Sequence, residues 1–234
     1  MQADHFLKGR PVSLHVLDYG LFKVHANGRV IGICGFLIQT DAGECVLVDT
    51  GFPAKYAEDT AAATAEDRLY EFGKVLQCDP INMPAPQLAL AGVTPDQIGL
   101  HIMTHTHIDH VGGIADFPDA PMLVAGAERR LDRPLYWGDV QPLDWPDQDY
   151  LVIEKDVQIG PGFRVLMVPG HTPGQLALWL ELPETGAVLL TSDAISRPEC
   201  QHHVFRWHCD NHWYDGRWRN RDGGKCTQSP GHCG

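Results

Sequence analysis

The sequence predicts an α/β protein, and three features of the chain support this fold class. Short apolar runs bounded by Gly, Pro or Asp recur along the chain, which is typical of strands. Segments with apolar residues at helical spacing lie between some of these runs. Several runs also end at a His or an Asp, and α/β proteins assemble their sites from strand ends that converge on one edge.

The N-terminal part is expected to form a strand followed by a β-hairpin. Residues 12–19 alternate between apolar and polar side chains, and residues 30–40 form a second apolar run. Residues 41–44 read Asp-Ala-Gly-Glu, which is a turn signal before the apolar residues 45–48. The hairpin ends at Asp49, for which two interpretations stay open: it supports a metal site, or it simply caps a turn.

The middle of the chain is expected to contain helices and two short strands. Residues 55–77 are rich in Ala and charged residues, with apolar residues at helical spacing, so most of this segment is predicted as helix. Thr94 and Pro95 form a helix-start signal before a strand over residues 100–103. A strand over residues 121–124 then leads into a short helix over residues 125–131, whose Glu128, Arg129 and Arg130 are expected to face solvent.

The later part of the chain is predicted to be rich in strands. Residues 137–146 form an aromatic, Pro-containing loop, which is either a lid that faces the substrate or a surface loop with its own small apolar cluster. Strands are expected over residues 151–153, 163–168, 175–182 and 187–190.

The composition suits one α/β domain or two small ones, and it disfavours several partners. The net charge is −12 over 234 residues, without a Lys/Arg-rich run before the last few dozen, so no nucleic-acid partner is expected. No apolar stretch is long enough to span a bilayer, and residues 1–6 lack the pattern of a signal peptide. A cytoplasmic protein without a membrane partner is therefore expected. The odd count of seven cysteines argues against a disulfide framework.

A cluster of metal-capable side chains follows the predicted strand over residues 100–103. Residues 104–110 read Thr-His-Thr-His-Ile-Asp-His, and they contain His105, His107, Asp109 and His110. On an extended turn, side chains two positions apart share a face, so His105 and His107 can point the same way. Asp109 and His110 then face another way and could serve a second ion. The sequence therefore predicts a metal site here.

Two later residues extend this cluster. His171 lies in Pro-Gly-His-Thr-Pro-Gly (169–174), and Asp193 lies in Thr-Ser-Asp-Ala (191–194). Alone, the first would be an ordinary turn residue and the second an ordinary cap. Together with the four earlier side chains they are too many for one tetrahedral ion that keeps an open position. They suit two ions bridged by one carboxylate and one water-derived hydroxide.

These three motifs resemble those of the metallo-β-lactamase superfamily of metallohydrolases, in the same order and with similar spacing over about residues 12–198. The resemblance implies a four-layer αββα sandwich with two zinc ions between the sheet edges, and iron, manganese or cobalt could replace zinc. Carried over by motif, the first ion would be held by His105, His107 and His171. The second would be held by Asp109 and His110, and Asp193 would bridge the two.

Within the superfamily, the chain is most similar to the N-acyl-homoserine lactonases, which act in quorum quenching. The similarity lies in residues 14–20, 35–51 and 169–176 and in the strand end at Asp193. It implies hydrolysis of a lactone ester, with Asp109 and Asp193 as catalytic residues and Asp109 moving a proton as well as binding metal. Those lactonases carry a Tyr shortly after the bridging Asp, whereas residues 194–197 here read Ala-Ile-Ser-Arg.

Other functions stay open. The chain could be another hydrolase of the same fold that cleaves a thioester or a different ester, or a truncated, metal-poor and non-catalytic homologue. A true β-lactamase, a glyoxalase II and a nuclease are less consistent with the sequence. A small-molecule lactone or ester is the expected substrate, and the aromatic loop over residues 137–146 is consistent with a homodimer.

The last 35 residues differ in composition from the rest, so the chain is divided into a metallohydrolase domain (1–199) and a tail (200–234). The tail holds four of the seven Cys and five of the thirteen His, but its only residue among Val, Ile, Leu and Met is Val204. Three interpretations compete: a zinc-binding appendage, a disordered basic tail, or a lost reading frame, which we favour. His232 resembles the Gly-His that ends the family's ligand set, although Cys233 stands where an Asp is expected.

Overall fold

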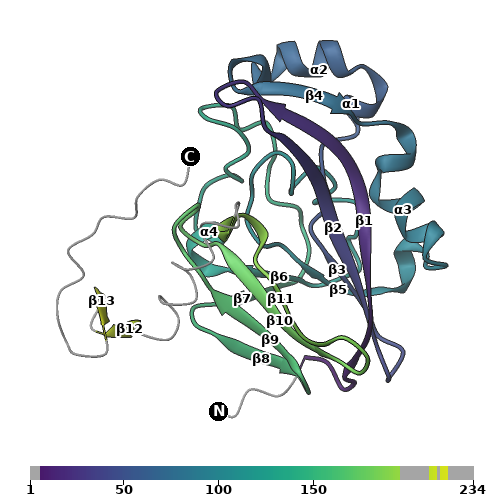
Figure 1. The fold of residues 1–234 in the computed structure, drawn as a ribbon, viewed down its shortest axis with the longest axis vertical. Helices are drawn as coiled ribbons and strands as arrows, with labels where there is room; N and C mark the ends of the chain where they lie inside the picture. Colours follow the sequence, from purple (N-terminus) through teal and green to yellow (C-terminus); the bar gives the residue numbers. More distant parts are fainter. Residues whose placement is uncertain (1–5, 196–210, 215–216, 221–234) are drawn as a thin grey trace.

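The computed structural model describes residues 6–195, 211–214 and 217–220, and two β-sheets dominate the fold (Figure 1). The larger sheet has the strand order β4-β1-β2-β3-β5-β6-β7, and the smaller has the order β11-β10-β9-β8. The larger sheet consists of β1 (Pro11–Val24), β2 (Val30–Thr40), β3 (Cys45–Val48), β4 (Gly73–Gln77), β5 (Ile98–Ile102), β6 (Met122–Ala125) and β7 (Tyr150–Ile153). The smaller sheet consists of β8 (Val157–Gly160), β9 (Phe163–Met167), β10 (Leu176–Leu182) and β11 (Gly186–Leu190).

The direction of the strands places several loops at one edge of the larger sheet. Strands β3, β5, β6 and β7 run parallel, whereas β1, β2 and β4 are antiparallel to their neighbours. Val48 at the end of β3 pairs with Ile102 at the end of β5. The segments that begin at Asp49 and at Met103 therefore leave the sheet side by side, because the carboxyl ends of parallel strands meet at one edge.

The helices are short and pack mainly against the larger sheet. Helix α2 contacts β4, α3 contacts β1, and α4 contacts β6 and β7. Figure 1 shows α1, α2 and α3 along the side of this sheet that faces away from β8–β11. The α-helices are α1 (Lys55–Glu58), α2 (Thr60–Glu66), α3 (Pro84–Leu90) and α4 (Gly126–Arg129), and the 3-10 helices are η1 (Leu69–Glu71), η2 (Pro80–Asn82), η3 (Pro95–Gln97) and η4 (Ser192–Ala194).

Two large apolar cores hold these layers together, because each strand of the larger sheet presents side chains to both faces. One core lies between this sheet and the helices, and it includes Tyr19, Leu47, Tyr56 and Leu88. The other lies between the two sheets and is formed largely by branched side chains. Its members include Ile38, Val46, Leu100, Ile102, Leu123, Phe163, Val165, Leu176, Leu178 and Leu180. The α/β class and the packed sheets of the expected sandwich are confirmed.

The predicted long helix over residues 55–77 is wrong in its second half. Helix α2 begins after Asp59, whose Oδ1 accepts hydrogen bonds from two backbone N–H groups of its first turn. The helical segment ends near Arg68, which has a φ of 55°. The following residues form β4, which pairs with β1 and directs Val75 into the core. Pairing with an existing strand therefore outweighs the helical spacing of this segment.

Most of the other predicted elements correspond closely to the structure, although the first strand, expected over residues 12–19, extends to Val24 as β1. The hairpin of β2 and β3 has the predicted bounds, and every later strand that was expected is present within one or two residues. None of the helices in the described ranges is long and apolar enough to cross a membrane. In the predicted tail, β12 (Asn211–Tyr214) and β13 (Arg217–Asn220) form a two-stranded antiparallel sheet. The rest of the tail, including His232, lies outside the described residues.

Candidate metal centre

The loop after β5 carries the first four predicted ligands, and its backbone is held firmly in place. The backbone of Tyr136 bonds to the loop on both sides of His107. Its N–H donates to the carbonyl of Thr106 (2.8 Å), and its carbonyl accepts from the N–H of Ile108 (3.0 Å). The Tyr136 hydroxyl donates to the buried carboxylate of Asp67 over 2.6 Å. The imidazoles of this loop therefore project from a fixed backbone.

The imidazoles of three histidines lie close together beside this loop. The ligand atoms of His105, His107 and His171 all lie within 4.8 Å of one another. Nδ1 of His107 is 2.9 Å from Nε2 of His171, although the two residues are 64 positions apart in the chain. His105 is buried, His107 is half-buried and His171 is exposed, so the group opens toward solvent on one side. Three converging imidazoles with an open side are a common arrangement for a zinc ion that keeps a free position.

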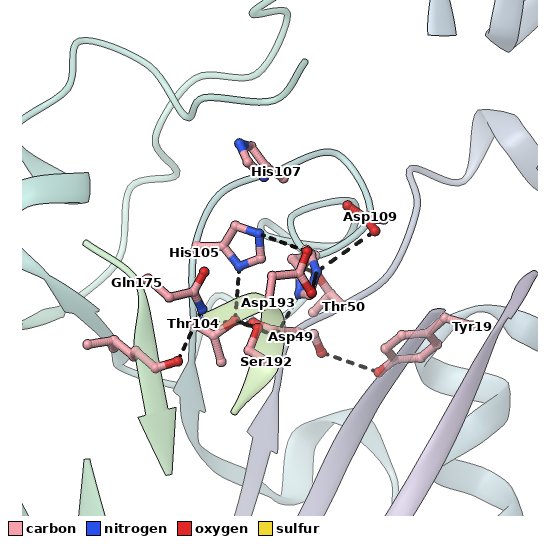
Figure 2. A network of polar contacts seen from close by, with 12 residues as sticks. Tyr19, Asp49, Thr50, Thr104, His105, His107, Asp109, Gln175, Ser192 and Asp193 are labelled. Carbon is pink, nitrogen blue, oxygen red and sulfur yellow. Dashed lines mark hydrogen bonds and ion pairs between the residues drawn. The ribbon is translucent and has the colours of Figure 1, made fainter. Parts of the chain in front are cut away.

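Asp193 lies close to His105 (Figure 2), and its carboxylate also approaches His171 and His110. Its Oδ2 is 3.3 Å from Nε2 of His171 and 4.0 Å from Nε2 of His105. Its Oδ1 is 3.8 Å from Nε2 of His110. The two oxygens of one carboxylate therefore face different imidazoles, one of them His110 and the other His171 and His105.

A second group of ligand atoms shares members with the first. His105, His110 and Asp193 also have ligand atoms within 4.8 Å of one another. Asp109 lies beside this group, with its Oδ2 3.8 Å from Nε2 of His110. The structure thus brings together the six predicted residues from the described part of the chain.

The hydrogen bonds of His105 leave one of its ring nitrogens ready for a metal. Thr104 Oγ1 lies 2.7 Å from Oδ2 of Asp49, which accepts its only proton. Nδ1 of His105, 3.3 Å from the same hydroxyl, must then be the donor in that contact. Nε2 therefore carries the lone pair, and this buried atom has no hydrogen-bond partner among the described residues. A buried, unpartnered imidazole nitrogen among other ligand atoms fits a metal ion.

His110 is oriented in the same way by Asp49. Nδ1 of His110 is 2.8 Å from Oδ2 of Asp49, so this nitrogen donates and Nε2 faces Asp109 and Asp193. Asp49 also accepts from the backbone N–H of Thr104 over 2.8 Å. One carboxylate thus holds the loop and two imidazoles, which supports the first of the two interpretations of Asp49.

The electrostatics of the centre favour a bound cation. Burial, followed by the neighbouring histidines, lowers the pKa of His105 well below its usual range, and it lowers the pKa of His107 to about 4. Both rings are therefore neutral near pH 7, which is the form that binds metal. At His110, burial opposes protonation, but the carboxylates of Asp109 and Asp49 outweigh it and raise the pKa to about 10. Burial, together with Asp193, raises the pKa of Asp109. This cluster of carboxylates attracts positive charge.

The loop over residues 110–113 packs tightly against the loop that follows β3. The Thr50 hydroxyl donates to the carbonyl of His110 (2.9 Å) and accepts from the N–H of Gly113 (3.0 Å). A Cβ on Gly112 would lie 2.1 Å from the carbonyl carbon of Phe52 and 2.3 Å from its oxygen. Only glycine permits this approach, because backbone atoms cannot move aside as a side chain can.

Gly112→Ala is expected to destabilise the protein by about 2 kcal/mol or more, since the added methyl must displace the backbone that carries His110. Urea unfolding would measure this loss. Gly32→Ala is the matched control, because a Cβ at Gly32 meets nothing within 4 Å. The control should change the unfolding free energy by no more than about 0.5 kcal/mol. Equal unfolding free energies for the two variants would contradict the expectation.

Three contributions to the centre were missed or misplaced by sequence reasoning. Glu128 was expected to face solvent, and this is wrong: it is 0% exposed and bonded to both loops that carry the histidines. Thr104 and Ser192 were not singled out, yet their hydroxyl oxygens lie 2.9 Å apart and link the residues before His105 and Asp193. Each of the two directly precedes a predicted ligand, which is the only signal that the sequence offers for them.

The aromatic loop over residues 137–146 packs on the protein core. Trp137, Val140, Leu143 and Trp145 all contact the core beside the helices. The ring of Trp137 lies 4.9 Å from that of Phe72, between ring centroids. These contacts favour the interpretation as a loop with its own apolar cluster over that of a lid.

Comparisons with known proteins identify relatives of this chain. It is 31% identical over 174 residues to the N-acyl homoserine lactonase AiiA of Bacillus thuringiensis subsp. kurstaki, and 34% identical over 164 residues to an N-acyl homoserine lactonase of Bacillus cereus. Each alignment covers 68% of this chain and 62% of the relative, so the chain spans less than two thirds of the length of these proteins.

The fold is also similar to that of a solved structure. A mutant of B. thuringiensis AiiA, with N-decanoyl-L-homoserine bound at the active site, matches with a TM-score of 0.67 at 24% identity. The match covers 85% of this chain and 81% of the other. The family model of the metallo-beta-lactamase superfamily matches residues 35–224, which include part of β2 and all the later strands. The chain belongs to the metallo-beta-lactamase superfamily.

Proposed function

We propose that this protein is a hydrolase with two metal ions that opens the ring of a lactone, with N-acyl-homoserine lactones as the first substrate class to test. The observation that carries the proposal is the position of Asp193, whose Oδ1 faces His110 and whose Oδ2 faces His171. A carboxylate in this position suits a bridge between two ions. The similarity to curated N-acyl homoserine lactonases supports the choice of substrate.

The residues of this chain divide into two sets in the proposal. His105, His107 and His171 would hold one ion, and Asp109 and His110 would hold the other, with Asp193 shared between them. Zinc is the expected metal, because neutral imidazoles and carboxylates suit it, and iron, manganese or cobalt could take its place. When bound, such ions supply Lewis acidity toward an ester carbonyl and lower the pKa of water.

The remaining chemistry falls to the side chains. Asp109 is half-buried beside His110, and in the proposal it passes a proton to the departing alkoxide of the opened ring. Asp49 fixes the position of the His110 ring relative to the backbone before His105 through its hydrogen bonds. Residues 194–197 contain no Tyr, so the substrate carbonyl must be oriented by other groups than in lactonases that have one.

A hydrolysis panel tests the proposed function. Metal-loaded protein is expected to open acyl-homoserine lactones or simple γ- and δ-lactones, and His107→Ala is expected to lose this activity, because one of three converging imidazoles is removed. Base consumption or a pH indicator would follow ring opening, with a thioester and a β-lactam in parallel. Turnover of only the thioester or only the β-lactam would overturn the substrate class. Metal analysis that gives clearly less than one equivalent would instead favour a non-catalytic homologue.

A further inference from the structure

A buried glutamate on α4 lies behind the proposed metal centre. Glu128 is 0% exposed, and neither of its oxygens lies within ion-pair distance of a cationic side chain in the part of the chain that the structure describes. A carboxylate in such surroundings costs free energy unless hydrogen bonds compensate it. Its partners therefore indicate why the position holds a Glu.

The first partner lies between two of the proposed ligands. The Thr106 hydroxyl donates to Oε2 of Glu128 over 2.6 Å and accepts from the N–H of Leu135 over 3.0 Å. Thr106 separates His105 from His107, so this bond fixes the part of the loop after β5 from which both imidazoles project. The 2.6 Å distance is typical of a strong bond between a hydroxyl and a charged oxygen.

The second partner lies on the loop of the third proposed ligand. The N–H of Gly174 donates to Oε1 of Glu128 over 3.1 Å, three residues after His171. A Cβ at Gly174 would lie 2.5 Å from Cγ of Glu128 and 2.9 Å from its backbone nitrogen. The glycine thus allows the loop to approach α4 closely enough for its N–H to reach the carboxylate.

These contacts join two loops that are distant in the sequence through the two oxygens of one side chain. We propose that Glu128 is a positioning residue, which sets the separation between the His105–His107 pair and His171 and thereby the affinity of the first metal position. This inference rests on the proposed function. An apolar residue of similar size would pack at this position with less desolvation, but it could not join the loops.

Metal affinity is the property that distinguishes this role from a purely structural one. Glu128→Ala is expected to weaken binding of the first zinc or cobalt equivalent about 10- to 100-fold, which is the range for groups that orient metal ligands. The loss of metal affinity should be smaller in Glu128→Gln. The amide oxygen of Gln can still accept from the N–H of Gly174, whereas the Thr106 hydroxyl loses its acceptor. Thr106→Val should resemble Glu128→Gln, and Thr106→Ser should restore affinity close to that of the wild type.

The experiment is a competition between the full-length protein and a chromophoric chelator for zinc, with circular dichroism to verify folding. Glu154→Gln serves as the matched charge control, because Glu154 is exposed and pairs with Arg130 near the same helix. Leu88→Ala serves as the stability control, since Leu88 is 0% exposed in the core beside the helices. Leu88→Ala should lower the unfolding midpoint without changing the zinc competition.

The outcomes separate the inference from the proposed function. Unchanged competition in folded Glu128→Ala and Thr106→Val would overturn the positioning role and leave the proposed function intact. A wild-type protein that holds less than one equivalent of zinc would overturn both. If Glu128→Ala does not fold, Glu128→Gln decides the matter, because it removes only the bond from the Thr106 hydroxyl to the carboxylate. Thr106→Val removes the same bond together with the one from the N–H of Leu135.

Discussion

Replacing Asp193 by alanine is expected to lower kcat/KM for the best lactone substrate by about 1,000-fold or more, and to lower the metal content from two equivalents to at most one. In the structure, Oδ2 of Asp193 faces His171 and His105, whereas Oδ1 faces His110. Without this carboxylate, two ions would lose a shared ligand and a shared negative charge. Lewis-acid assistance is worth several kcal/mol, and about 4 kcal/mol corresponds to about 1,000-fold in rate.

Two further variants sharpen the test of Asp193. Asp193→Asn keeps the shape and one carbonyl oxygen, so it should retain more metal than the alanine variant while losing most of the activity. Asp119→Asn is the matched control, because Asp119 is an exposed carboxylate in the segment before β6. Metal content would be measured by atomic absorption, and activity with saturating metal. Two tightly bound equivalents in Asp193→Ala would rule out the bridging role.

The sequence was sufficient to group the six candidate ligands, because they share a local signal. His105, His107, Asp109 and His110 follow one apolar strand at close spacing, while His171 and Asp193 each follow another. Convergence of strand ends is a general property of α/β proteins, so such positions can be grouped before a structure is available. The geometry of the six residues agrees with that grouping.

The supporting residues could not be predicted in the same way. Glu128 follows Ala127 and precedes two arginines, and a charged residue in such a helix is usually solvated. Its burial follows from the return of the loop of Gly174 onto α4, a contact between residues 46 positions apart. Strand β4 was missed for a related reason, since its pairing with β1 is a tertiary contact that no local spacing reveals.

A second large effect is expected from His101, which lies on β5 and faces the core beside the helices. It pairs in register with Leu47 and Met122, and its ring centroid is 5.8 Å from that of Phe117. The side chain is 0% exposed, and neither ring nitrogen has a hydrogen-bond partner among the described residues. Burial lowers the pKa of His101 from 6.5 to about 4, although the Asp49 carboxylate favours the charged form.

The direction of the pH effect follows from proton uptake. Between pH 6.5 and about 4 the unfolded chain binds a proton at this position that the folded protein excludes, so the free energy of unfolding falls as the pH falls through this window. The corresponding loss is about 3 kcal/mol, because one pKa unit corresponds to about 1.4 kcal/mol. Other groups titrate in the same range, so the contribution of His101 must be taken as a difference between variants.

His101→Leu isolates this contribution, because leucine has a similar volume and cannot take up a proton. The expected result is that the wild type loses about 3 kcal/mol more than His101→Leu between about pH 7 and about pH 4, measured by urea unfolding with a chelator present. The chelator keeps both proteins free of metal, so the other histidines contribute equally and cancel. His25→Gln, which alters an exposed histidine, should follow the wild type over the whole range. If the wild type and His101→Leu instead have parallel pH profiles, His101 does not set the acid stability of the fold, and other titrating groups account for the loss.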